Sequence, residues 1–287
     1  MNKKIAILLV ITLIFGGMMH YTQKTPVAKS ESELIIYNID VGQADCALVL
    51  CGDKSMLIDG GNVSDSSLIY SFLKEHQINH LDYIIATHPH EDHVGGLSGA
   101  LNFATVEKVY CPVKEYDSKA FKDFVKYLNV QEKEITIPEP GEIFMLGDAT
   151  IQIIGPLKKY SDINNFSIVL RITFNNTSFL FTGDIERDAE LDIIDSGYDL
   201  KSNVLKVSHH GSSSSSTYPF LYYVMPEYAV ISCGKNNAYS HPDEATLSKF
   251  KDLSAKIYRT DLHGTITCIS DGVNIIFKTT KAPENDS

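Results

Sequence analysis

The sequence predicts a single α/β domain of two layered β-sheets with associated helices. Three observations predict this class. Short apolar strands recur from residue 34 onward, amphipathic helices lie both between and after them, and the composition does not change abruptly along this region. The 287 residues, 44% of them hydrophobic, would allow one large or two ordinary domains. The absence of an internal break favours one domain, over residues 34–281, followed by a short tail at 282–287.

The N-terminal region differs from the rest of the chain. Lys3 and Lys4 precede a run of uncharged residues at 5–19, which has the length of a secretory h-region and is short for a membrane span of about 20 residues. The polar stretch that follows argues against a buried core helix. We therefore expect residues 1–22 to be a signal peptide or an N-terminal membrane anchor, and 23–33 a linker. Either form would leave the protein secreted or anchored on the outer face of the cytoplasmic membrane.

The first half of the domain begins with apolar segments rich in branched residues, which are typical of strands. These strands are expected at 34–41, 46–51, 55–59 and 82–88. Segments with apolar residues at helical spacing, the first with a Ser/Asp start, predict helices at 64–77 and 117–128.

In the second half, the segments 166–174 and 178–183 flank "NNT", the strongest hairpin signal in the chain. Strands and helices then alternate. Helices are expected at 186–194, 217–225 and 243–253, and strands at 203–210, 228–234, 256–261, 264–270 and 273–279.

Net charge and cysteine content narrow the function classes. The formal charge of −11 excludes nucleic-acid binding through overall charge, although a local basic groove or a bound metal could still receive phosphate. Loss of residues 1–24, which contain three lysines and no acid, would lower the charge to −14. The five cysteines are odd in number and not closely spaced, so a disulfide framework is not expected. They include no C-x-x-C pair, so a cysteine-based zinc site is not expected either.

The segment "THPHEDHVGG" at 87–96 carries the strongest chemical signal. His88, His90, Asp92 and His93 follow the end of a predicted strand. In a turn at that position, the first two can point together, and the last two can point toward an adjacent spot, which gives two half-built metal sites. Imidazole and carboxylate ligands suit zinc, with manganese or iron as alternatives. The two glycines that follow let the next helix start close to the metals.

Three later strand ends offer further ligands. Asp184 ends the segment "LFTGD", where it could also cap the next helix. His209 and His210 end the predicted strand 203–210, and strand alternation would send them to opposite faces, so that only one faces the site. His241 follows another strand in "YSHP". His20, His76 and His80 fall outside every motif and are expected at the surface.

Together these motifs resemble the metallo-β-lactamase superfamily, whose H-x-H-x-D-H signature is similar to "THPHEDHVGG". "LIDGG" (57–61) and "LFTGD" (180–184) resemble its opening and bridging aspartate motifs. More narrowly, "DVGQADCALV", "LKVSHHGS", "ISCGKNNAYSHP" and "YRTDLHGTI" resemble the hydrolase domain of ComEC-type competence proteins, and secreted phosphorylcholine esterases share much of this pattern.

The resemblance implies an αββα sandwich of two mixed β-sheets flanked by helices, with two divalent metal ions at the strand ends. Carried over to this sequence, His88 and His90 hold metal one, Asp92 and His93 hold metal two, and Asp184 bridges. The sequence has Asn164 and Asn165 where many members place a further histidine. We therefore assign His210 to metal one, with His209 as the alternative, and His241 to metal two.

Other motif residues are expected to support the ligands. Asp59 would accept a hydrogen bond from a liganding histidine, or else only shape its turn. Asp40, Gln43 and Asp45 share a tight turn between strands, and one of them would line the cleft. Asp261 and His263 are expected to shape a hairpin rather than bind metal.

The expected reaction is hydrolysis by a hydroxide that two metals share, with Asp92 and Asp184 as the catalytic carboxylates. The narrower resemblance favours a phosphodiesterase with nuclease activity on DNA, using zinc or manganese. Two alternatives remain. One is a phosphodiesterase acting on a small head group, such as the phosphorylcholine of a cell-wall polymer. The other is a non-catalytic metal-binding module of a DNA-uptake system. The oligomeric state is left open.

Overall fold

The computed structural model describes residues 33–282, and every structural statement below concerns that part of the chain. The predicted signal or anchor at 1–22, the run at 5–19 proposed as a membrane tether, and nearly all of the predicted linker and tail lie outside the described residues. Within 33–282, no helix combines the length and the apolar character that a membrane crossing requires.

The first sheet has eight strands in the order β15-β14-β1-β2-β3-β4-β5-β6. Strands β15 to β3 pair antiparallel, whereas β3 to β6 pair parallel, so the sheet is mixed. Its strands are β1 (Leu34–Asn38), β2 (Ala47–Cys51), β3 (Lys54–Ile58), β4 (His80–Ile85), β5 (Thr105–Tyr110), β6 (Ile135–Thr136), β14 (Ile266–Ser270) and β15 (Ile275–Thr279).

The second sheet has seven strands in the order β13-β12-β11-β10-β9-β8-β7 and is also mixed. The run from β10 to β13 is parallel, and the run from β7 to β10 is antiparallel. Its strands are β7 (Ile143–Leu146), β8 (Ala149–Gly155), β9 (Val169–Phe174), β10 (Thr177–Phe181), β11 (Val204–Lys206), β12 (Tyr228–Ile231) and β13 (Lys256–Arg259).

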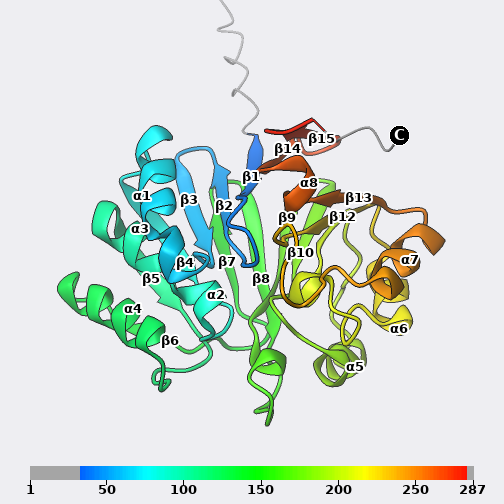
Figure 1. The fold of residues 1–287 in the computed structure, drawn as a ribbon, viewed down its shortest axis with the longest axis horizontal. Coiled ribbons are helices and arrows are strands. Elements are labelled where there is room, and N and C mark those ends of the chain that lie inside the picture. Colours follow the sequence, from blue (N-terminus) through cyan, green and yellow to red (C-terminus); the bar gives the residue numbers. More distant parts are fainter. Residues whose placement is uncertain (1–32, 283–287) are drawn as a thin grey trace, which may run out of the picture. The chain divides into compact units, whose positions relative to one another are not determined.

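Helices cover the outer face of each sheet, as Figure 1 shows with α1, α3 and α4 on one side and α5, α6 and α7 on the other. The inward residues of both sheets form one apolar core, and each helical layer closes a further core against its own sheet. The helices are α1 (Ser66–Glu75), α2 (Glu91–Val94), α3 (Leu97–Phe103), α4 (Lys119–Val130), α5 (Arg187–Asp195), α6 (Tyr218–Val224), α7 (Glu244–Asp252) and α8 (Thr260–His263). The predicted αββα sandwich of two mixed β-sheets is confirmed.

Several elements differ from the sequence-based prediction. The hairpin predicted around Asp261 and His263 is wrong, because Thr260–His263 forms the short helix α8, which carries the chain from one sheet to the other. Strands β5 to β8 and the short helix α2 were not predicted, whereas α3 is the helix expected after the two glycines. A signal for β7 and β8 was present, since the Gly147-Asp148 pair between two apolar segments marks their turn. All five cysteines are buried, and none of them is in a disulfide in this structure.

Candidate metal centre

The loop after β4 brings the first ligand candidates together. His88 is buried in this loop, and His90 is the N-cap of α2, the short helix that carries Asp92 and His93. His88 Nε2 lies 3.0 Å from His90 Nδ1, so these two imidazoles point at a common place. His93 is fully buried, whereas the Asp92 side chain is 32% exposed and can therefore meet a solute.

A close backbone approach holds this loop in position. Any Cβ on Gly96 would lie 1.9 Å from the carbonyl oxygen of Gly60, so only glycine allows α3 to begin against the loop after β3. The same loop carries Asp59, whose φ of 57° turns the chain out of the sheet. The glycines of "HVGG" thus fix the distance between the loop with Asp59 and the loop with His93.

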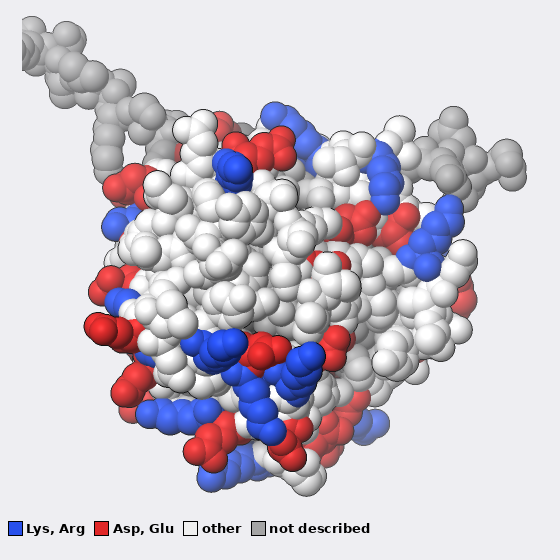
Figure 2. Space-filling model, turned by 60° about the vertical axis from the view of Figure 1, so that its left-hand side comes forward, with Lys and Arg blue, Asp and Glu red and all other residues white. Residues whose placement is uncertain are grey.

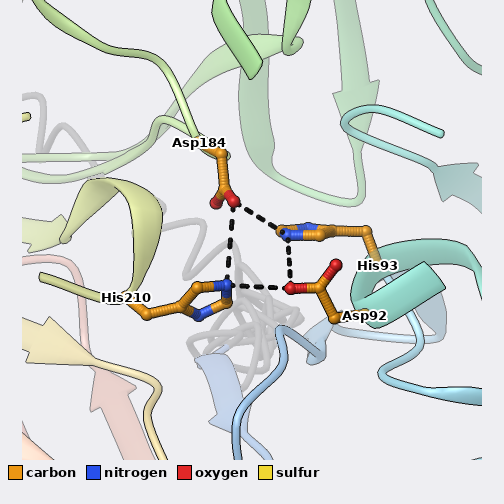
Figure 3. A group of neighbouring side chains, drawn as sticks. All are labelled: Asp92, His93, Asp184 and His210. Atoms are coloured by element: carbon orange, nitrogen blue, oxygen red, sulfur yellow. Dashed lines mark hydrogen bonds and ion pairs between the residues drawn. The ribbon is translucent and has the colours of Figure 1, made fainter. Parts of the chain in front are cut away.

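Four side chains from three loops form the tightest polar cluster, which Figure 3 shows: Asp92, His93, Asp184 and His210. His210 Nε2 lies 3.2 Å from Asp92 Oδ2 and 3.7 Å from Asp184 Oδ2. His93 Nε2 lies 3.3 Å from Asp184 Oδ2 and 3.8 Å from Asp92 Oδ2. One ligand atom from each residue lies within 4.8 Å of all the others, which suits a single metal ion.

Asp184 occupies the middle of the site rather than a helix end. Its Oδ2 also lies 3.9 Å from His88 Nε2, so this carboxylate faces both groups of histidines. The preceding Gly183 has a φ of +51°, and the Asp184 amide donates to Ser167 Oγ at 3.1 Å. Helix α5 starts at Arg187, and the Asn165 side chain accepts hydrogen bonds from its first turn. The alternative role of Asp184 as a helix cap is therefore wrong.

The predicted alternation of His209 and His210 along a strand is also wrong. Strand β11 ends at Lys206, and both histidines lie in a tight turn with φ values of 48° and 53°. Both consequently face the site, since His209 Nε2 lies 3.9 Å from Asp184 Oδ2. His210 groups with Asp92 instead of with His88, so its assignment to metal one does not fit the geometry.

His241 lies outside the cluster of Figure 3. Its ring centroid lies 5.7 Å from that of His209, and its buried Nδ1 has no hydrogen-bond partner within the described residues. Both rings line a pocket of about 370 Å³ that also contains His90 and Asp184. With His210 placed beside Asp92, the geometry leaves His209 and His241 for the ion on the side of His88 and His90. The prediction of His241 as a metal-two ligand does not match this arrangement.

The inner histidine His93 is fixed by a buried carboxylate. Its Nδ1 donates to Asp59 Oδ2 at 2.8 Å, and Asp59 is itself held by the backbone amide and hydroxyl of Thr87, both at 2.7 Å. Such a contact selects the tautomer in which the lone pair of Nε2 points into the site. Asp59 thus does more than shape a turn.

A buried ion pair supports His210. Its Nδ1 donates to the carbonyl oxygen of Ser232 at 3.1 Å and lies 3.6 Å from Asp45 Oδ1. Lys206 Nζ binds Asp45 at 2.8 Å, and both side chains are less than a tenth exposed. Lys206 was not predicted as a site residue, because it lies within an apolar strand pattern. Two other residues share the turn with Asp45. Gln43 lines the pocket, and Asp40 pairs with Lys281 at the surface.

The donor set fits a cation. His93 Nε2 and Asp184 Oδ1 are buried without a hydrogen-bond partner among the described residues. Burial lowers the pKa of His93, but Asp184, Asp59 and Asp92 together raise it well above its usual range. The site thus attracts positive charge strongly, and a metal ion can replace that proton. Burial and the nearby His93 hold the pKa of His88 well below its usual range, which leaves a neutral imidazole suited to metal.

Three pocket residues were not predicted as site residues: Asn164, Tyr239 and Glu91. Asn164 Oδ1 is buried and has no hydrogen-bond partner in the described part of the chain. The absence of the expected histidine at this position was the only sequence signal for it. Asn165 turns away from the pocket and caps α5.

These observations define an αββα protein with donor groups for metal ions at the strand ends of both sheets. Residues 39–235 match the family model of the metallo-beta-lactamase superfamily, and the chain belongs to this superfamily. Its members are generally metal-dependent hydrolases and typically hold two metal ions. Asp184 lies between one group of donors with Asp92, His93 and His210 and a second with His88 and His209.

Two curated relatives resemble much of this chain. The ComE operon protein 3 of Bacillus subtilis is 32% identical over 84% of the chain, and the competence protein ComA of Neisseria gonorrhoeae is 30% identical over 88%. The match spans only 33% and 34% of those proteins. Among solved structures, the metallo-beta-lactamase fold protein YhfI of Bacillus subtilis matches 83% of the chain and all of its own, with a TM-score of 0.54 and 14% identity. That likeness concerns the fold alone.

Proposed function

We propose that this chain is an exported phosphodiesterase that uses two divalent metal ions and acts on nucleic acid. The observation that carries the proposal is the position of Asp184, whose Oδ2 lies within 4 Å of four imidazole nitrogens from two groups of donors. One group is His88 and His90, with His209 and His241 beside them. The other is Asp92, His93 and His210. Imidazole and carboxylate donors favour zinc, and manganese is the alternative.

When bound, two such ions would lower the pKa of a water between them and offset the charge of a phosphodiester. The residues of the chain orient the reaction. Asp92 is the only partly exposed carboxylate of the cluster in Figure 3, so it can orient the attacking water and accept its proton. The buried Asp184 carries negative charge between the two donor groups, because burial raises its pKa less than His93 and His210 lower it.

The substrate class rests on the relatives and on the pocket. One relative is named a competence protein, and competence is the uptake of DNA by a cell, which supports DNA as the substrate. The pocket beside the cluster measures about 370 Å³, enough for a phosphodiester with the groups that flank it.

One observation favours phosphorylcholine esters instead. Tyr239 is 69% exposed at the pocket and its ring stacks on His241 at 5.7 Å. An exposed aromatic face can attract a quaternary ammonium group. A non-catalytic metal-binding role is the third hypothesis. An activity measurement distinguishes it from the two enzymatic hypotheses.

The test is a substrate screen with metal-reconstituted full-length protein. The substrates are single- and double-stranded DNA, bis-p-nitrophenyl phosphate, p-nitrophenyl phosphate and p-nitrophenyl phosphorylcholine. We expect cleavage of DNA and of the diester, clearly faster than cleavage of the monoester. Hydrolysis of the choline ester without DNA cleavage would support the alternative substrate, and no hydrolysis by metal-loaded protein would refute an enzymatic role.

Export rests on Lys3, Lys4 and the apolar run at 5–19. Fractionation of the native host should recover the protein in the medium or on the outer face of the membrane. Recovery from the cytoplasm with an intact N-terminus would refute export.

A further inference from the structure

A second cavity lies outside the metal pocket. It measures about 780 Å³ and runs along α4 and the loop before it. We call it the α4 groove and define it by Lys114, Tyr116, Phe121, Lys122, Val125 and Lys126. None of these residues has a role in the centre described above.

One aromatic residue joins the α4 groove to the metal pocket. The Tyr116 ring lies edge-on to His90, with 6.1 Å between centroids, and edge-on to Phe121 at 6.2 Å. His90 lines the metal pocket, and Tyr116 and Phe121 line the groove. Tyr116 therefore lies between the groove and the candidate ligand His90.

The charge of the groove differs from that of the protein as a whole. Three exposed lysines line it in a chain whose formal charge is −11. Lys122 pairs with Asp117, whereas Lys114 and Lys126 make no ion pair that involves the described residues. Glu115 is the other acid in the lining. Figure 2 looks onto the side that carries α4 and shows blue Lys and Arg side chains interspersed with red Asp and Glu side chains on its lower half.

The lining also has an apolar part. Val125 and Tyr116 are partly exposed, and Val130 at the end of α4 is 76% exposed. Lys122 and Lys126 are one helical turn apart, so their amines can follow one edge of the groove while the aromatic and aliphatic side chains form its floor. A basic edge beside an aromatic platform is the arrangement that binds an unpaired nucleic-acid strand, with phosphates at the lysines and bases on the rings.

We propose that the α4 groove binds a single strand of nucleic acid and leads it past Tyr116 to the metal centre. The substrate would then be an unpaired strand, because paired bases could not reach the apolar floor. This inference rests on the proposed phosphodiesterase function, and it adds where and in what form the polymer binds.

The test is the binding of a fluorescein-labelled, cleavage-resistant phosphorothioate oligothymidine to the full-length, metal-loaded protein, measured by anisotropy. We expect Lys114→Gln/Lys126→Gln to raise Kd at least about tenfold. Loss of two phosphate contacts should also make the slope of log K against log salt shallower by about 1.4. The matched control Lys251→Gln/Lys278→Gln removes the same charge from α7 and β15, and should change Kd less than twofold.

A second pair of variants tests the aromatic platform. Tyr116→Leu should weaken binding about fivefold or more, and Tyr116→Phe, which keeps the ring, should restore it. Equal binding by the groove variant and the control variant would overturn the proposal. So would lysine-dependent binding of anionic phospholipid vesicles with no binding of the oligonucleotide. Because binding is measured without turnover, a failed groove and a failed phosphodiesterase assignment give different results.

Discussion

Replacement of Asp184 by Asn tests the residue on which the two donor groups converge. The change keeps the size of the side chain and removes its negative charge. Its Oδ2 lies 3.3 Å from His93 Nε2 and 3.9 Å from His88 Nε2, and the side chain is only 3% exposed, so little solvent can replace the lost charge. Two unit charges 4 Å apart interact by about 4 kcal/mol at an effective dielectric constant of 20.

Relaxation of the site would offset part of the lost interaction energy. We therefore expect a rate loss of at least about a hundredfold, or roughly 2.7 kcal/mol of barrier. The assay is kcat/KM on bis-p-nitrophenyl phosphate, with metal content measured on the same samples. The matched control is Asp188→Asn, because Asp188 is an exposed carboxylate in the first turn of α5. This substitution should leave kcat/KM nearly unchanged. Near-parental turnover with two bound ions in Asp184→Asn would refute the reasoning.

Three further variants test the supporting residues. Asp59→Asn weakens the contact that orients His93, so metal affinity should fall about 10- to 100-fold; unchanged affinity in a chelator competition would contradict this. Lys206→Met leaves Asp45 buried without its partner, so the free energy of unfolding, measured in urea, should fall by about 3–5 kcal/mol. A loss below about 1 kcal/mol would show that the ion pair is dispensable. His210→Ala should lower the metal content by about one ion per chain, and full metal content would remove it from the ligand set.

The sequence located the site because its residues lie in short motifs at strand ends. His88 to His93 form one continuous segment, so local spacing alone showed that they converge. Asp184 and His241 each followed a predicted strand, and His210 ended one. The carboxyl ends of neighbouring parallel strands meet at one edge of a sheet. The strand order β10-β11-β12 accounts for this convergence.

Two kinds of feature could not be predicted from the sequence. One depends on the backbone direction over a few residues, and the other depends on packing between residues that are distant in the chain. His209 and His210 both face the site, against the prediction, because β11 ends at Lys206. A turn with positive φ values follows, so the side chains do not alternate as they would in a strand. The contact of Lys206 with Asp45 joins residues 161 positions apart, and no local pattern reports such a pair. The α4 groove is likewise invisible in the sequence, because it depends on how the loop with Tyr116 packs against α4.

The proposed function requires that these residues bind metal and that phosphodiester hydrolysis depends on it. The most direct measurement is a titration of the metal-stripped, full-length chain with Zn²⁺, and with Mn²⁺ in parallel, in which bound ions and bis-p-nitrophenyl phosphate hydrolysis are followed in the same samples. We expect about two ions per chain at saturation, with hydrolysis rising as the second ion binds. Two bound ions without hydrolysis in either titration, or hydrolysis that persists in the stripped protein, would refute the proposed function.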